Sequence, residues 1–445
     1  KAGKEQKDKS GKEQQASGEK SGSESGAGLT KKETARELEK VSREIAENES
    51  EEEEIAYEFP SLDLLKKPPR ERGGMSDEEL REMHRVLYKC VEYMAANYAE
   101  FTDKYMPLSE KEMEILEYQS KYPFLAGTFR PDYLVTDDGQ LKLCEITSRF
   151  FGHGIFMSYF AEAAANKFME KHPGCHRESL FEQMMQSALE IVGDKDEIFV
   201  LKSSDKTSEI KLYKPFYEHF GKKVTILEAD EVEARIDDWN GKFVISALNQ
   251  MDILSYSMDT IKAMIDSRMY NDFRTVFLIH DKRFMRLWFM PEFTRNFLTD
   301  EEAEFLRAHA IETWICKDKS SEDILKKAYA DKNGYILKHF RLGKSEKVYA
   351  GPLTDGNKWK ELFDDGSIRD MIIQPFLYQK SYRTVWEGTP FNDYICGMML
   401  CIDDKYFDSG LFRTSSCPVT NMVDDRKAFP LVTDDARIIS CGDVL

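Results

Sequence analysis

The sequence predicts an α+β fold with an inserted parallel α/β layer in the middle of the chain. Three short apolar runs at 197–201, 223–227 and 242–248 are separated by polar or helix-like sequence, which is typical of a parallel layer. From residue 330 onward the pattern changes to strands and hairpins. The chain has 445 residues, of which 41% are hydrophobic, so it can bury a sizeable core in two or three folded units.

The N-terminal region divides into a tail and a helical segment. Residues 1–55 are rich in Lys, Glu, Ser, Gly and Gln and end in an acidic run, so we expect a disordered charged tail. Folding should begin near Tyr57. Ser76 and Glu79 have the spacing of a capping box, and an apolar stripe from Leu80 to Met94 follows them at helical spacing. These helices and the hairpin described next form a predicted unit over 56–175.

A β-hairpin is predicted over residues 128–150. Two apolar stretches flank Asp137-Asp138-Gly139, which is a favoured hairpin turn. Asp132 would open the first strand, and Glu145 would lie near the end of the second. The two carboxylates can approach each other across the ladder, where they would repel each other unless a cation lay between them. The hairpin therefore predicts a metal site.

The middle of the chain should form a substrate-binding α/β domain over 176–275. A helix is expected over 156–172, before this domain begins. Another is expected within it, through Leu180, Met184, Ala188 and Ile191. The three apolar runs would be its strands, and 203–221 would supply a crossover helix.

The last unit is predicted over 276–445. The run TVFLI at 275–279 is interpreted as a strand that leads toward Lys282, and Thr299 with Glu302 should cap a helix. Strands are then expected in YILKHF, KVYAG, MIIQPFL, ICGMMLCI and YFDSGLFR.

Three features of this unit suggest binding of a phosphorylated ligand. Lys338 lies within a predicted strand and is followed by a basic, Gly-containing turn, which suits a polyphosphate; the alternative is a surface hairpin with a basic tip. Gln374 and Pro375 end a strand and would expose backbone groups to a nucleobase, although an ordinary strand end is equally consistent. Arg413 offers bidentate geometry for a carboxylate or phosphate, or it forms a surface ion pair.

The pattern R-P-D … C-E-I-T, formed by Arg130, Asp132, Glu145 and Thr147, resembles the R-x-D … E-x-N metal motif of the ATP-grasp superfamily. Here it precedes the Lys338 strand and the Gln374 hinge. That order resembles the circularly permuted branch, which includes eukaryotic-type glutathione synthetase and glutathionylspermidine synthetase. The resemblance covers about 120–420 and implies an ATP-grasp-like fold in circularly permuted order.

The resemblance also implies an activity. Members of this branch are ATP- and Mg-dependent, ADP-forming ligases that join a carboxylate to an amine through an acyl phosphate. The small-molecule partners would be an amino-acid or peptide-like carboxylate and an amine. Carried over to this sequence, the metal ligands are Asp132, Glu145 and Thr147; the ATP contacts are Lys282, Lys338, Arg341, Gly343, Lys344, Ser345, Gln374 and Phe376; the catalytic arginines are Arg130 and Arg413; and the substrate contacts are Ser148, Arg149 and Arg413.

The sequence departs from the family pattern in three places. Thr147 replaces an Asn, and its hydroxyl has a shorter reach to a metal. The glycine loop is reduced to GKSEK, where Glu346 is the candidate for a further metal carboxylate. Arg149, Phe150, Phe151 and His153 replace a segment of small residues, so the substrate need not be γ-glutamylcysteine. Arg149 either holds a different acidic substrate or is a structural residue on the rim of the site.

Composition limits the possible partners and the location of the protein. The net charge of −18 argues against nucleic acid as a partner, and no apolar run is long enough to cross a membrane. The eight cysteines lack CxxC spacing, so we expect reduced thiols and a cytoplasmic protein. A homodimer is expected from the resemblance alone. Two alternatives stay open: a catalytically inactive ATP-grasp-like protein for nucleotide binding or scaffolding, and an ordinary α/β protein with no nucleotide site.

Overall fold

The structure is a computed structural model, and its contacts divide the chain into residues 1–58 and 59–445. The predicted tail over 1–55 lies outside the described residues, as does nearly all of the helix expected at 156–172. No described helix is both long enough and apolar enough to cross a membrane. The described residues, all of which belong to the second unit, are 75–152, 154, 158, 166, 169–170, 181–203, 212–343, 345–386, 389–408, 411–423, 425–433 and 438–440.

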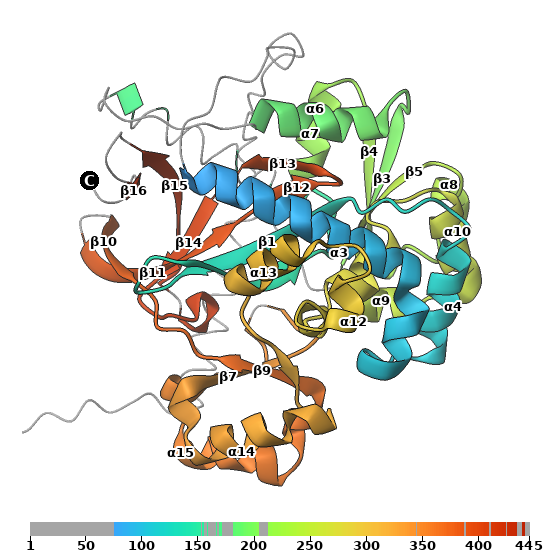
Figure 1. Cartoon of the computed structure of the whole chain (residues 1–445). Coiled ribbons are helices and arrows are strands. Elements are labelled where there is room, and N and C mark those ends of the chain that lie inside the picture. Colours follow the sequence, from blue (N-terminus) through green and yellow to red (C-terminus); the bar gives the residue numbers. More distant parts are fainter. Residues whose placement is uncertain are drawn as a thin grey trace, which may run out of the picture. The chain divides into compact units, whose positions relative to one another are not determined.

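A nine-stranded antiparallel sheet forms the centre of this unit (Figure 1). Its main path runs β13-β12-β1-β11-β14-β15-β16, while β2 pairs with β1 and β10 pairs with β11. The predicted strand ICGMMLCI is divided between β11 and β12. The strands are β1 (Thr128–Val135), β2 (Leu141–Thr147), β10 (Ser381–Trp386), β11 (Thr389–Met398), β12 (Leu400–Ile402), β13 (Lys405–Asp408), β14 (Leu411–Ser415), β15 (Lys427–Thr433) and β16 (Ile438–Ser440).

The predicted hairpin is confirmed as β1–β2. Gly139 has φ +84°, a backbone conformation that glycine adopts without strain, and the Thr136 N–H donates to the Gln140 carbonyl at 3.0 Å. Asp132 is the direct cross-strand partner of Glu145, as the sequence suggested. A bulge next to this pair inserts Cys144 as an unpaired residue, and a bulge of this kind re-aims the neighbouring side chains.

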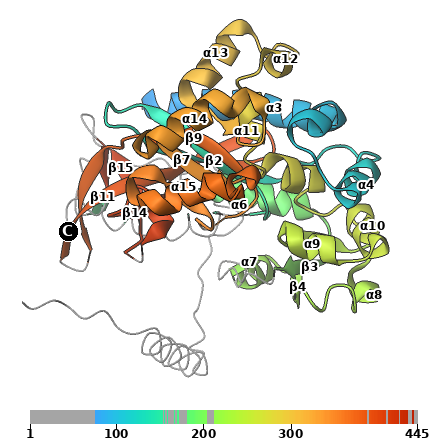
Figure 2. The same ribbon diagram turned by 90° about the horizontal axis from the view of Figure 1, so that it is seen from below.

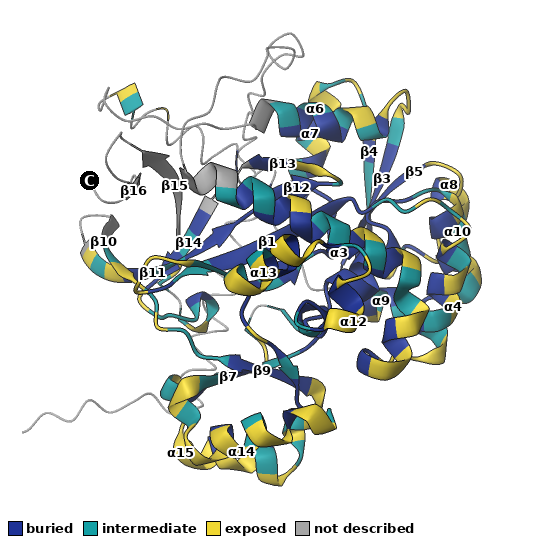
Figure 3. Cartoon of the chain, viewed as in Figure 1, coloured by how far each residue is buried: buried dark blue, intermediate teal, exposed yellow. Residues whose placement is uncertain are grey.

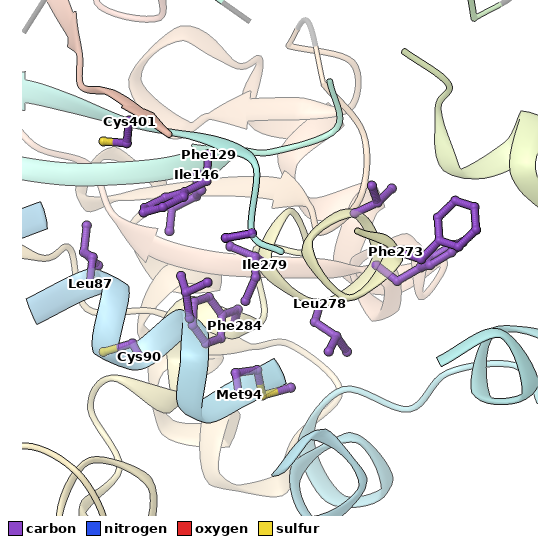
Figure 4. Close-up of a cluster of buried hydrophobic side chains, with 14 of the residues drawn as sticks. Leu87, Cys90, Met94, Phe129, Ile146, Phe273, Leu278, Ile279, Phe284 and Cys401 are labelled. Atoms are coloured by element: carbon purple, nitrogen blue, oxygen red, sulfur yellow. The ribbon is translucent and has the colours of Figure 1, made fainter. Parts of the chain in front are cut away.

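The long helix α3 (Met75–Tyr105) packs its apolar stripe against the sheet and the segment after residue 270. Figure 4 shows Leu87, Cys90 and Met94 facing the cluster that contains Phe129 and Ile146. The helix begins at Met75, so Ser76 lies in its first turn rather than before it. The other helices of this layer are α4 (Glu110–Gln119), α11 (Phe284–Leu287), α12 (Pro291–Thr294) and α13 (Asp300–His309), the last with the predicted Thr299–Glu302 capping box.

The prediction of a strand at 275–279 is wrong. Residues Thr275–Ile279 form a π-helical turn, η2, in which the His280 N–H donates to the Thr275 carbonyl at 3.2 Å. All five side chains are buried. A short run that is apolar on every side fits a buried helical turn as well as a buried strand, so periodicity could not separate the two.

The predicted parallel layer is confirmed. Its strand order is β4-β3-β5, with β3 (Glu197–Lys202), β4 (Lys223–Glu228) and β5 (Phe243–Ala247) all parallel. This layer has its own hydrophobic cluster. The predicted crossover helix is α7 (Tyr213–His219), and the other helices are α6 (Phe181–Val192), α8 (Ile236–Trp239), α9 (Gln250–Ser255) and α10 (Met258–Asp266).

Residues 314–375 form a small α+β lid unit. Its antiparallel sheet has the order β6-β9-β7-β8, with β6 (Trp314–Ile315), β7 (Tyr335–His339), β8 (Val348–Ala350) and β9 (Met371–Pro375). The helices α14 (Glu322–Ala330) and α15 (Gly356–Asp364) lie below this sheet in Figure 1 and in front of it in Figure 2. Both helices therefore lie on one side of the sheet, and their outer faces are exposed in Figure 3.

Candidate functional site

A narrow cleft with a volume of about 100 Å³ lies beside the lid sheet. One part of its wall is apolar, with Leu134, Ile336 and Val348 among the lining residues. The other part carries most of the predicted site. Eight predicted residues line the cleft: Glu145, Lys282, Lys338, Gly343, Ser345, Gln374, Phe376 and Arg413.

Two lysines approach Glu145 from different elements. Lys282 Nζ lies 3.6 Å from Glu145 Oε2 and donates to the Leu342 carbonyl at 2.8 Å, while Lys338 Nζ donates to the Cys144 carbonyl at 3.3 Å. Burial alone raises the pKa of Glu145, but Lys282, Lys338, Arg413 and Arg130 outweigh it and lower the pKa to about 2. Glu145 is therefore charged at neutral pH. Burial lowers the pKa of Lys282, whose side chain is nearly inaccessible.

Asp132 is held between two arginines. It is fully buried and accepts from Arg130 Nε at 2.8 Å and Arg130 Nη2 at 3.0 Å, while Arg413 Nη2 donates to it at 2.5 Å. Both carboxylate oxygens are therefore occupied. Thr147, the third predicted metal ligand, receives a long contact of 3.4 Å from Arg130 Nη2.

These residues fit a magnesium ion in part. Glu145 keeps 30% of its side chain exposed at the cleft and can offer an oxygen, whereas Asp132 can do so only if Arg413 or Arg130 turns away. Among the described residues, no group of three or more His, Cys, Asp or Glu side chains could hold a metal ion by itself. Four cations and two carboxylates meet here, so the group has a net positive charge that favours an anionic ligand.

The predicted hinge lies on the opposite wall. Gln374 is fully buried; its amide nitrogen donates to Thr313 Oγ1 at 2.8 Å, and its Oε1 accepts no hydrogen bond from the described part of the protein. The Phe376 N–H donates to the Gly334 carbonyl at 2.9 Å, so that donor is already used. Gln374 thus brings an acceptor to the wall of the cleft.

Other predicted residues lie away from the cleft lining. Arg341 pairs with Glu112 Oε1 at 2.8 Å and with Asp281 Oδ2 at 3.3 Å, so its guanidinium is already engaged within the protein, and its phosphate contact stays a prediction. Lys344 and His153 lie outside the described residues. Glu346, the candidate for a further metal carboxylate, is exposed.

The two proposed substrate residues, Ser148 and Arg149, lie near the turn at 275–280. Ser148 is buried; its hydroxyl donates to the Thr275 carbonyl and its N–H donates to His280 Nδ1. Arg149 lies over the Phe150 ring at 4.7 Å and beside Gly343. The N–H and the hydroxyl of Ser148 are thus both used within the protein. Arg149, in contrast, lies beside Gly343, which lines the cleft.

Sequence reasoning missed one thiol in the cleft wall, Cys396. Cys396 and Cys144 both line the cleft; Cys144 Sγ donates to the Asp132 carbonyl at 3.3 Å, and Arg413 Nη2 lies 3.4 Å from Cys396 Sγ. The only signal for Cys396 was its place in an alternating strand. None of the six described cysteines forms a disulfide, as expected.

Comparisons with known proteins matched one family model and solved structures. A family model described as the AnkG N-terminal domain matches residues 81–278, which is less than half of the chain. No curated protein matches. One solved structure, described as a presumed γ-glutamylcysteine synthetase from Methylobacillus flagellatus KT, is 10% identical with a TM-score of 0.35 and covers 75% of this chain and 83% of that chain. A likeness at this level determines neither fold nor function.

Proposed function

We propose that this protein is an ATP- and Mg-dependent, ADP-forming ligase that joins a carboxylate to an amine. The observation that carries this proposal is the convergence of Glu145, Lys282, Lys338 and Arg413 in one cleft beside the Gln374 wall. These residues come from four separate segments, and the cleft has one apolar and one cationic part. A nucleoside triphosphate has the same division into a flat base and a charged tail.

In this proposal the nucleotide spans the cleft once the lid unit has opened, because the cleft as it stands, about 100 Å³, is smaller than a typical ligand site. Its base lies against the apolar wall, where Gln374 Oε1 accepts from the exocyclic amine of adenine. Lys282 and Lys338 contact the phosphates, and Gly343 allows the loop backbone to approach them. Lys282 can keep its contact with the Leu342 carbonyl, because its ammonium has further N–H groups to donate to the phosphates.

Magnesium would be held by Glu145, and by Asp132 once Arg413 has turned toward the substrate. When bound, the ion would neutralise charge on the transferred phosphoryl group. Arg413 is suited to that exchange because its guanidinium, which contacts Asp132 through Nη2, can bind a carboxylate of the substrate with two N–H groups.

The chemistry would proceed in two displacements. A substrate carboxylate oxygen attacks the γ-phosphorus, the bond from phosphorus to the bridging oxygen of ADP breaks, and an acyl phosphate forms. The amine nitrogen then attacks the acyl carbon, phosphate leaves with its oxygen, and the amine loses a proton to give an amide. Arg130 and Arg413 stabilise the negative charge that develops, and the protein supplies alignment rather than a covalent nucleophile.

A second candidate function is nucleotide binding without turnover. Asp132 is fully paired with two arginines, and Thr147 is a poorer ligand than the Asn of the resembled motif. If Arg413 does not release Asp132, the site binds a nucleotide without a productive metal geometry. The two candidates differ in one observable, the release of ADP.

The deciding experiment measures ADP and phosphate release with Mg-ATP against pools of amino acids, γ-glutamyl peptides and polyamines, with mass spectrometry of each pool. A product mass equal to two substrates minus water supports the ligase. Lys338→Met should reduce nucleotide affinity at least tenfold, whereas Lys326→Met on the exposed face of α14 should leave it unchanged. ATP binding without release in any pool favours the second candidate, and no binding at all rejects both.

A further inference from the structure

Three segments that are far apart in the sequence meet behind the cleft. They are α4, the turn at 281–283 and the loop at 340–343 that follows β7. Arg341 joins all three: its Nη1 lies 2.8 Å from Glu112 Oε1 on α4, and its Nε donates to Asp281 Oδ2 at 3.3 Å. The guanidinium is therefore held from two sides by carboxylates of different elements.

Both carboxylates are buried. Asp281 is fully buried and also forms a bidentate pair with Arg283, with distances of 2.9 and 2.6 Å. Glu112 is 1% exposed, and its other oxygen accepts from the N–H and the hydroxyl of Ser109 in the capping box of α4. Paired charges in such a place are costly to break, because the partner left behind stays buried and unpaired.

The same loop fixes Lys282. The Lys282 N–H donates to the Phe340 carbonyl at 2.8 Å, and Lys282 Nζ donates to the Leu342 carbonyl at 2.8 Å. These two carbonyls flank Arg341 in the sequence. Arg283 adds a further contact, since its guanidinium lies 4.0 Å from the centre of the Phe340 ring. Any shift of the Arg341 backbone would therefore move the acceptor of the Lys282 ammonium.

We infer that Arg341 is a positioning residue, which holds the 340–343 loop between Glu112 and Asp281 and thereby fixes Lys282 in the cleft. The role in ligand binding rests on the proposed function, whereas the coupling of Arg341 to Lys282 is a property of the free protein. Arg341 acts from behind the loop and does not contact the phosphates. Lysine cannot replace it, because a single ammonium does not reach two carboxylates in this divergent geometry.

The first test uses the free protein. Arg341→Met should accelerate amide hydrogen exchange in the loop at least tenfold and should increase the rate at which an amine reagent, trinitrobenzenesulfonate, labels Lys282. Exchange in α3 should stay unchanged, which excludes general unfolding. Arg307→Met, an exposed arginine on α13, serves as the control and should alter neither rate. Unchanged exchange and labelling in Arg341→Met would overturn the inference whether or not the protein binds a nucleotide.

The second test separates positioning from direct contact. Arg341→Lys should behave like Arg341→Met, and Glu112→Gln should weaken ATP binding severalfold although Glu112 lies outside the cleft lining. The double variant Glu112→Gln/Arg341→Met should bind no more weakly than Arg341→Met alone, because the two residues act through one bridge. If Glu112→Gln leaves ATP affinity intact while Arg341→Met lowers it, Arg341 contacts the nucleotide itself and the inference is wrong.

Discussion

At the scale of single residues, the contribution of Glu145 to the stability of the fold should depend on pH. Its pKa of about 2 lies below the usual value near 4.5, so its charge stabilises the fold above pH 4.5 and this contribution is lost as the pH falls toward 2. After allowance for the exposed part of the side chain, we expect Glu145→Gln to lower the free energy of unfolding by roughly 2 kcal/mol at pH 7. Urea unfolding at pH 7 and pH 3 tests this. The difference from wild type should shrink at pH 3, and a difference that is constant with pH would contradict the ion-pair origin.

Asp132 should behave differently, although it faces Glu145 across the ladder. Asp132→Asn leaves Arg130 and Arg413 without their countercharge in a buried place, which costs about 3–5 kcal/mol. Chemical denaturation should therefore show a larger loss than for Glu145→Gln. A loss of activity in Asp132→Asn could therefore arise from unfolding as well as from the loss of a metal ligand. The magnesium dependence of Glu145→Gln is the cleaner measurement of a metal role. Equal stability losses in the two variants would refute the stabilising pairing of Asp132 with Arg130 and Arg413.

At the scale of elements, close packing between β1 and β11 constrains the sheet under the site. A Cβ added to Gly397 on β11 would lie 2.2 Å from the Tyr133 ring on β1. We expect Gly397→Ala to displace this ring and to lower the melting temperature, with a cost of about 1–3 kcal/mol. Gly356→Ala, at the open first position of α15, is the matched control and should be neutral or slightly stabilising. A neutral Gly397→Ala would show that the ring can move freely.

The elements also show which contacts of the site could be predicted from the sequence. The Asp-Gly turn set the register of β1 and β2 as far as the pair Tyr133–Leu143, but without the bulge Asp132 would pair with Cys144, so the pairing of Asp132 with Glu145 depends on a bulge that the turn does not specify. The contact of Arg413 with Asp132 could not be predicted locally either, because Arg413 reaches Asp132 from β14, 281 residues later in the chain. The ion pair of Arg341 with Glu112 could not be predicted for a similar reason: the local sequence suits a phosphate, and nothing local reveals that Glu112 lies next to the loop.

At the scale of the whole molecule, the lid unit carries a hydrophobic cluster separate from those of the nine-stranded sheet and the parallel layer. Leu337 on β7 and Trp359 on α15 are buried in it, and the Trp359 indole N–H donates to the Ala328 carbonyl. The apolar alternation of β7 and the amphipathic pattern of α15 specify this cluster locally. Its contacts with the rest of the fold include those of the 340–343 loop with Lys282 and of Gln374 with Thr313, and both Lys282 and Gln374 line the cleft.

A separate core predicts that the lid can open without loss of the main sheet. Leu337→Ala removes a fully buried side chain and should cost about 2–5 kcal/mol, mostly within residues 314–375. Hydrogen exchange should accelerate in β7, β9 and α14 while α3 keeps its protection, and ATP affinity should fall because Lys338 lies next to the altered position. Leu87→Ala on α3 is the matched control, which should weaken the main core first. If Leu337→Ala accelerates exchange equally in α3 and the lid, the two cores unfold together, and closure over a ligand cannot be an independent motion of the lid.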